Sequence, residues 1–80
     1  MNILTIKNLV ENNTISSLEK MELKILDSIE GKNDISEEGD QLSNILAAKQ
    51  IIEKAHENGT EVKTEIRLFF KGVRNIIGWI

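Results

Sequence analysis

The residues best suited to ion binding are acidic and lie near the middle of the chain. Asp34, Ser36 and Glu38, followed by Gly39, match positions 1, 3, 5 and 6 of an EF-hand calcium loop. The motif is incomplete, because position 12, which should be a bidentate Glu, is Ile45. We therefore interpret the acidic run as the start of a helix, where carboxylates favour the positive end of the helix dipole, and we expect no calcium site.

Catalytic chemistry has no better support in the sequence. The chain holds one histidine, His56, and no cysteine, so no metal-binding set of His and Cys can be assembled. No serine lies in a nucleophile-elbow motif, and the single His cannot be assigned as the general base of any particular serine. We expect no enzyme activity, no cofactor and no metal, and we interpret His56 as a residue suited to the C-terminal end of a helix.

A basic stripe is the other charged feature of the sequence. Its members follow one another at steps of four, four and three residues: Lys63, Arg67, Lys71 and Arg74. Residues 61–80 hold these four basic residues and two acids, a net charge of +2, whereas residues 1–60 hold six lysines and eleven acids, a net charge of −5. The stripe is therefore either a binding surface or a solvated face that complements an acidic body.

The same C-terminal segment carries an apolar face. Its apolar residues recur at helical spacing and fall within an arc of roughly 100°: Val62, Ile66, Phe69, Phe70, Val73, Ile77 and Ile80. This pattern predicts an amphipathic helix that packs on the rest of the chain. Phe69 is near the centre of the face, and we expect it to be buried.

Two helices are predicted in the first thirty or so residues. The first runs from Ile3 to about Glu11 and buries Ile3, Ile6, Leu9 and Val10. The second is capped by Thr14 or by Ser16, which together with Glu19 matches a capping box, and it ends before Gly31. Its expected buried face consists of Leu18, Met21, Ile25, Leu26 and Ile29, with Glu22 inside that face.

A third predicted helix starts at Ser36, the expected N-cap, and ends at Asn58-Gly59. Thr60 can then cap the C-terminal helix. The apolar set of the third helix is wide, which is typical of a central helix with neighbours on two sides: Leu42, Ile45, Leu46, Ala48, Ile51, Ile52 and Ala55.

These elements predict an all-α fold, a small bundle of three or four short helices that forms a single domain over residues 1–80. No strand pattern competes with the helices. No apolar stretch approaches the length of a membrane span, and the N-terminus does not resemble a signal peptide. We expect a cytoplasmic protein without a membrane partner, consistent with the absence of cysteine.

Several blocks of sequence resemble a family of short uncharacterised proteins from Bacteroidetes. The matching blocks are Ile6–Glu11, Glu38–Ala48, Lys63-Thr64 with Arg67, and Val73–Asn75. The resemblance implies a stand-alone small cytoplasmic protein and carries no known activity. The C-terminal residues 76–80 are more apolar than that pattern.

The functional prediction is a non-enzymatic protein that binds another protein or itself, with a homodimer as the expected assembly. Leu68 lies off the apolar face of the last helix, and Trp79 and Ile80 extend past Gly78. The alternative is that Trp79 packs back onto the first helix. A second function is binding of a polyanion through Lys63, Arg67, Lys71 and Arg74, although the acidic body makes nucleic acid an unfavoured partner.

Overall fold

Four helices form the protein in a computed structural model that describes the backbone of residues 2–76 and the side chains of residues 2–72. They are α1 (Ile3–Asn12), α2 (Ile15–Ser28), α3 (Ser36–Asn58) and α4 (Val62–Ile76). No strand occurs in the described residues. The all-α prediction is confirmed, as is the central position of the third helix, because α3 packs against each of the other three.

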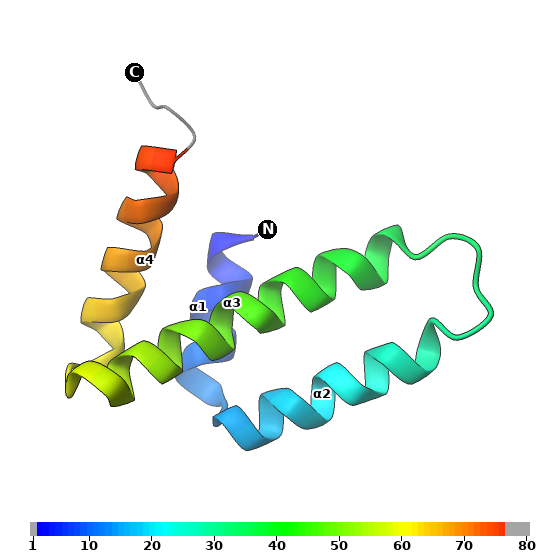
Figure 1. Ribbon diagram of the computed structural model, residues 1–80, viewed down its shortest axis with the longest axis horizontal. Helices are drawn as coiled ribbons and strands as arrows, with labels where there is room; N and C mark the ends of the chain where they lie inside the picture. The colour runs from blue at the N-terminus through cyan, green and yellow to red at the C-terminus, as the bar shows by residue number, and fades with distance from the viewer. Residues whose placement is uncertain (1, 77–80) are drawn as a thin grey trace.

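Figure 1 shows how the helices are arranged around α3. The helices α2 and α3 lie side by side as an antiparallel pair, α1 crosses behind α3, and α4 rises steeply from the C-terminal end of α3. α4 makes most of its contacts with α3 and a few with α1. The molecule is thin, with extents of 39 × 33 × 18 Å.

The starts of the helices are set by short polar side chains. Asn2 caps α1 by accepting a hydrogen bond from the Thr5 amide at 3.0 Å. Thr14 caps α2 in a capping box with Ser17, which confirms Thr14 as the cap and makes the predicted box of Ser16 and Glu19 wrong. Thr14 prevails because Ile15 is already helical, so Ser16 lies inside the first turn.

The start of α3 and the turn into α4 also differ from prediction. Ser36 is the first helical residue, and its amide donates to the Asp34 carboxylate at 3.1 Å, so Ser36 is not the N-cap. Gly59 ends α3 in the left-handed conformation with φ of 64°, as predicted. Thr60 is not at the N-cap position of α4, because α4 begins at Val62 and the carbonyl of Glu61 accepts the first backbone hydrogen bonds, from the amides of Thr64 and Glu65; the Thr60 hydroxyl donates to the carboxylate of Glu65.

The core lies where α1, α2 and α4 meet α3. It is built on the residues Ile6, Val10, Leu18, Ile45, Ala47, Ala48, Ile51 and Ile52. Most of these were expected, but three apolar residues predicted to be buried are exposed: Ile3 at 60%, Leu26 at 44% and Leu46 at 52%.

The three errors have a common geometric cause. Leu26 and Leu46 each follow a core-facing isoleucine by one residue, which turns them about 100° away from it around the helix. Ile3 is in the first turn of α1, whose packed residues are Ile6, Leu9 and Val10. Leu46 also lines an open hollow that Phe69 of α4 lines from the other side.

Candidate protein-interaction site

A buried carboxylate fixes the start of α4 against the end of α3. Glu65 is only 5% exposed, and its carboxylate accepts hydrogen bonds from the Thr60 hydroxyl at 2.5 Å and from the Asn58 side-chain amide at 3.5 Å. Asn58 is the last residue of α3, and Thr60 lies in the turn. These bonds therefore connect the two helices at their junction and help to set the direction of α4.

Removing this carboxylate should destabilise the protein. For Glu65→Ala we expect the free energy of unfolding to fall by about 1.5–3 kcal/mol, because hydrogen bonds to a charged acceptor are lost at a buried position. Glu65→Gln keeps one acceptor oxygen for the Thr60 hydroxyl, so its free energy of unfolding should fall less than that of Glu65→Ala. Chemical denaturation of both variants measures the difference, and equal small losses would show that the hydrogen bonds do not support the junction.

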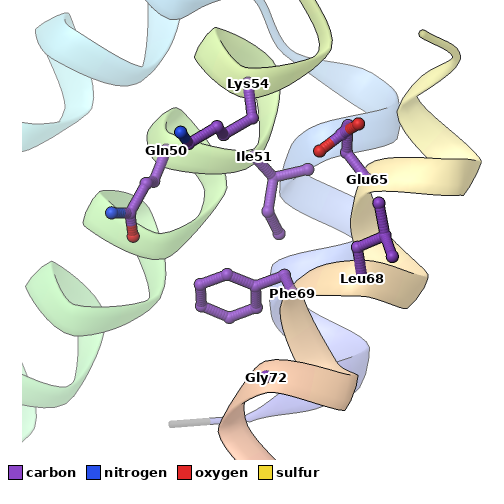
Figure 2. Close-up of a pocket in the computed structure, with 7 residues that line it drawn as sticks. All are labelled: Gln50, Ile51, Lys54, Glu65, Leu68, Phe69 and Gly72. Carbon is purple, nitrogen blue, oxygen red and sulfur yellow. The ribbon is translucent and has the colours of Figure 1, made fainter. Parts of the chain in front are cut away.

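Beyond this junction, α3 and α4 enclose an open apolar groove. Its first hollow has a volume of about 380 Å³. As Figure 2 shows, the ring of Phe69 points from α4 toward α3, and Leu68 and Gly72 lie on the same stretch of α4. A second hollow continues along α3 past Leu46 and Glu53.

The two hollows share Gln50 and Phe69, so we treat them as one surface, the α3–α4 groove. It is lined by Ser43, Leu46, Ala47, Lys49, Gln50, Ile51, Glu53 and Lys54 on α3, and by Glu65, Leu68, Phe69 and Gly72 on α4. Ala47 and Ile51 are buried, whereas Leu46 and Leu68 are 52% and 53% exposed at its edges. The groove thus has an apolar floor, and at its edges the two exposed leucines lie beside exposed polar residues.

Phe69 was expected to be buried and is only partly buried. It packs against the core and meets Phe70 edge to face, with ring centroids 5.2 Å apart and planes at 83°. Its remaining surface lines both hollows because α4 diverges from α3 instead of lying along it.

The basic stripe is exposed along α4. Lys63, Arg67 and Lys71 all have exposed side chains. Among the described residues the ion pairs are Lys32–Glu38 at 2.5 Å and Lys49 with Glu22 at 3.1 Å and Glu19 at 4.0 Å, so none involves the stripe. The side chain of Arg74 lies outside the described residues. Within the described residues, no ion pair therefore supports the interpretation that the basic stripe complements the acidic residues of the rest of the chain.

One lysine of the groove, Lys49, forms an ion pair with an acidic residue of α2. Lys49 donates to Glu22, the acid that interrupts the apolar face of α2, and this hydrogen bond raises the pKa of Lys49. Glu53, one turn further along α3, has an exposed side chain and forms no ion pair within the described residues. Lys54, which also lines the groove, is exposed and is in none of these ion pairs, so both an acidic and a basic side chain are available there.

The residues of the incomplete calcium motif do not form a loop. Ser36, Glu38 and Gly39 belong to the first turn of α3, as expected from the interpretation of the acidic run as the start of a helix. A hydrogen bond from Lys32 lowers the pKa of Glu38, and hydrogen bonds from Ser36 lower the pKa of Asp34. His56 is exposed in the last turn of α3.

The predicted self-association residues fall into two groups. Leu68 is exposed at the edge of the groove, next to Phe69. Trp79 and Ile80 lie outside the described residues. The sequence pattern did not indicate Leu46, Gly72 or Glu53 as parts of a site, because residues on two helices form the groove only after α4 packs at an angle to α3.

The fold and the groove identify the protein as a small all-α domain with an open surface between two helices. A family model matches residues 1–78, and the chain belongs to that family, a family of unknown function designated DUF6952. The expected membership in an uncharacterised family is confirmed, and the match does not bear on the source organism. No curated protein and no solved structure matches the chain.

Within residues 2–76, no helix is both long enough and apolar enough to cross a bilayer.

Proposed function

We propose that this protein is a non-enzymatic, cytoplasmic interaction module that self-associates through the α3–α4 groove. The observation that carries the proposal is the pairing of a half-buried Phe69 with exposed Leu46 and Leu68 along one continuous groove. Single exposed apolar residues are ordinary, but apolar residues that gather along a groove are typical of interfaces. The lack of cysteine fits a reducing cytoplasm.

The shape of the molecule supports the same proposal. Its radius of gyration is 13.7 Å, whereas a compact domain of this length should have one of about 12 Å. The α2–α3 pair runs along the longest axis of the molecule, and α4 departs steeply from it (Figure 1). A small domain with an open core gains stability when a partner covers the exposed apolar surface.

The experiment compares two substitutions of exposed leucines. In Leu68→Glu a charge is introduced at the edge of the groove, and in Leu23→Glu the same charge is placed on α2, where Leu23 is also exposed and lies outside the groove. Burying an unpaired carboxylate at an interface is costly, so we expect Leu68→Glu to weaken self-association at least about 30-fold. Leu23→Glu should leave it unchanged.

Sedimentation equilibrium of the wild type and both variants measures these dissociation constants. A wild-type protein that stays monomeric at about 100 µM, well above a micromolar dissociation constant, contradicts the proposal. Equal weakening by both variants would also contradict it, because the effect would then be one of net charge and not of the groove.

Polyanion binding is the second candidate function, favoured by the exposed side chains of Lys63, Arg67 and Lys71 on one helix. Like charges at successive i,i+4 positions slightly destabilise a helix, which a binding surface would explain. Arg74 belongs to the same stripe in the sequence. Binding to a fluorescent oligonucleotide that falls steeply with salt, and is lost when Arg67 and Lys71 are both changed to Glu, would favour this function.

A further inference from the structure

The turn between α3 and α4 contains a chemically labile pair of residues. Asn58 is followed by Gly59, and it is the one asparagine in the chain that a glycine follows. Asparagine is among the thermolabile residues of proteins. It loses its side-chain amide when the next backbone nitrogen attacks the side-chain carbonyl carbon, and a side chain on the next residue hinders that attack. Because glycine has no side chain, Asn58 is the asparagine most susceptible to this reaction.

The same residue takes part in the junction that directs α4. The side-chain amide of Asn58 donates to the carboxylate of Glu65 at 3.5 Å, and the Thr60 hydroxyl donates to the same carboxylate. Glu65 is 5% exposed, whereas Asn58 is accessible to solvent. If the Asn58 amide became a carboxylate, Glu65 would lose a donor and gain a like charge beside it. Both changes are unfavourable at a buried position.

We propose that Asn58 is a site of spontaneous deamidation whose products weaken the junction between α3 and α4. The backbone nitrogen of Gly59 forms a bond to Cγ of Asn58, the bond from Cγ to Nδ2 breaks, and the amide proton of Gly59 leaves with Nδ2 as ammonia. Water then hydrolyses the resulting cyclic imide at either of its carbonyl groups. One product is aspartate at position 58, and the other is isoaspartate, whose main chain is one carbon longer. Water is the only co-reactant.

The folded junction slows this reaction. Asn58 is the last helical residue of α3, and the amide of Gly59, which supplies the attacking nitrogen, donates to the carbonyl of Ala55. The reaction therefore requires the end of α3 to open. Helix ends open more readily than helix centres, and the rate should follow the population of the opened state. Loosening of the junction should therefore accelerate deamidation.

Both products change the junction in the same direction. Aspartate places a second carboxylate beside Glu65 and at the negative end of the α3 dipole. Isoaspartate also displaces Gly59, whose left-handed conformation ends α3. Since α4 follows directly from this turn (Figure 1), the modified chain should lose part of the packing between α3 and α4.

The first test measures the reaction in the wild-type protein. The protein is incubated at mildly alkaline pH and physiological temperature, and peptide mass spectrometry follows the exchange of amide for carboxyl at each asparagine. We expect conversion at Asn58, faster in denaturant than in the folded protein. Asn33, exposed in the loop between α2 and α3 and followed by Asp34, should convert more slowly. An unchanged Asn58 in folded protein, after a time that converts the denatured chain fully, overturns the proposal.

Two threonine variants test whether the junction controls the rate. Thr60→Ala removes a donor to Glu65 and should accelerate deamidation of the folded protein at least about threefold, because a lost hydrogen bond increases the opened population. Thr64→Ala, at an exposed threonine outside these hydrogen bonds, is the control and should leave the rate unchanged. Equal rates for the wild type and Thr60→Ala would contradict control by the junction.

The last test measures the effect of the product. Asn58→Asp reproduces the aspartate form and should lower the melting temperature by about 5 °C. The helix dipole contributes to that loss, so the substitution is repeated together with Glu65→Gln, where the like-charge repulsion is absent and the loss should be smaller. Equal losses with and without Glu65→Gln, or no loss at all, overturn the effect on the junction. Dilute, monomeric samples are used, so a failure of self-association leaves this inference standing.

Discussion

Replacing Ile51 by Ala should lower the free energy of unfolding by about 2–5 kcal/mol, the range for deleting a fully buried aliphatic side chain. Ile51 is 1% exposed in the middle of α3, and it lies both in the core and in the floor of the α3–α4 groove. A domain of this size has a total stability of roughly 4–12 kcal/mol, so the variant should lose a large part of its stability.

The control for Ile51→Ala is Leu46→Ala on the same helix. Leu46 is half-exposed, and its removal from the monomer should change stability by no more than about 0.5 kcal/mol. Urea denaturation of dilute samples measures both variants. Similar losses for the two would show that α3 does not present Ile51 to the core in the way the structure describes.

Phe69→Ala should impair both stability and self-association. We expect a loss of about 2–3 kcal/mol in the free energy of unfolding, less than for a fully buried Phe because the ring is half-exposed to the groove. The same change removes the apolar floor at the point where the two hollows meet, so dimerisation should weaken at least about 100-fold.

Phe70→Ala is the matched control for Phe69→Ala. Phe70 is also half-buried and packs against Phe69, but it does not line either hollow of the groove. It should therefore lose a similar amount of stability and keep most of its self-association at temperatures where it is folded. Calorimetry combined with sedimentation separates the two effects, and equal loss of association would contradict the role of Phe69 in the groove.

The sequence was informative where local chemistry decides the structure. Gly59 marked the end of α3, because a left-handed residue there is best supplied by glycine. Thr14 was one of two possible caps, and spacing alone could not choose between Thr14 and Ser16. Periodicity also located the apolar face of α4, since a pattern that repeats every three or four residues requires one buried side.

The sequence was less informative where the packing of two helices decides the outcome. Periodicity predicts the direction in which Leu46 and Phe69 point, but it does not predict the angle between α3 and α4, which leaves one exposed and the other half-buried. Glu65 was missed for a related reason. A carboxylate beside an apolar face is ordinarily exposed, and its burial depends on hydrogen bonds from Thr60 and Asn58 across the turn.

The most direct measurement of the central claim is an NMR concentration series on the wild-type protein. Between about 10 µM and about 1 mM, a range that spans dissociation constants of tens to hundreds of micromolar, the amide signals of Leu46, Leu68 and Gly72 should shift together. Signals around Leu23 on α2 should remain constant. Constant signals at the groove in a protein that tumbles as a monomer over the whole range, or shifts confined to α2, would contradict self-association through the α3–α4 groove.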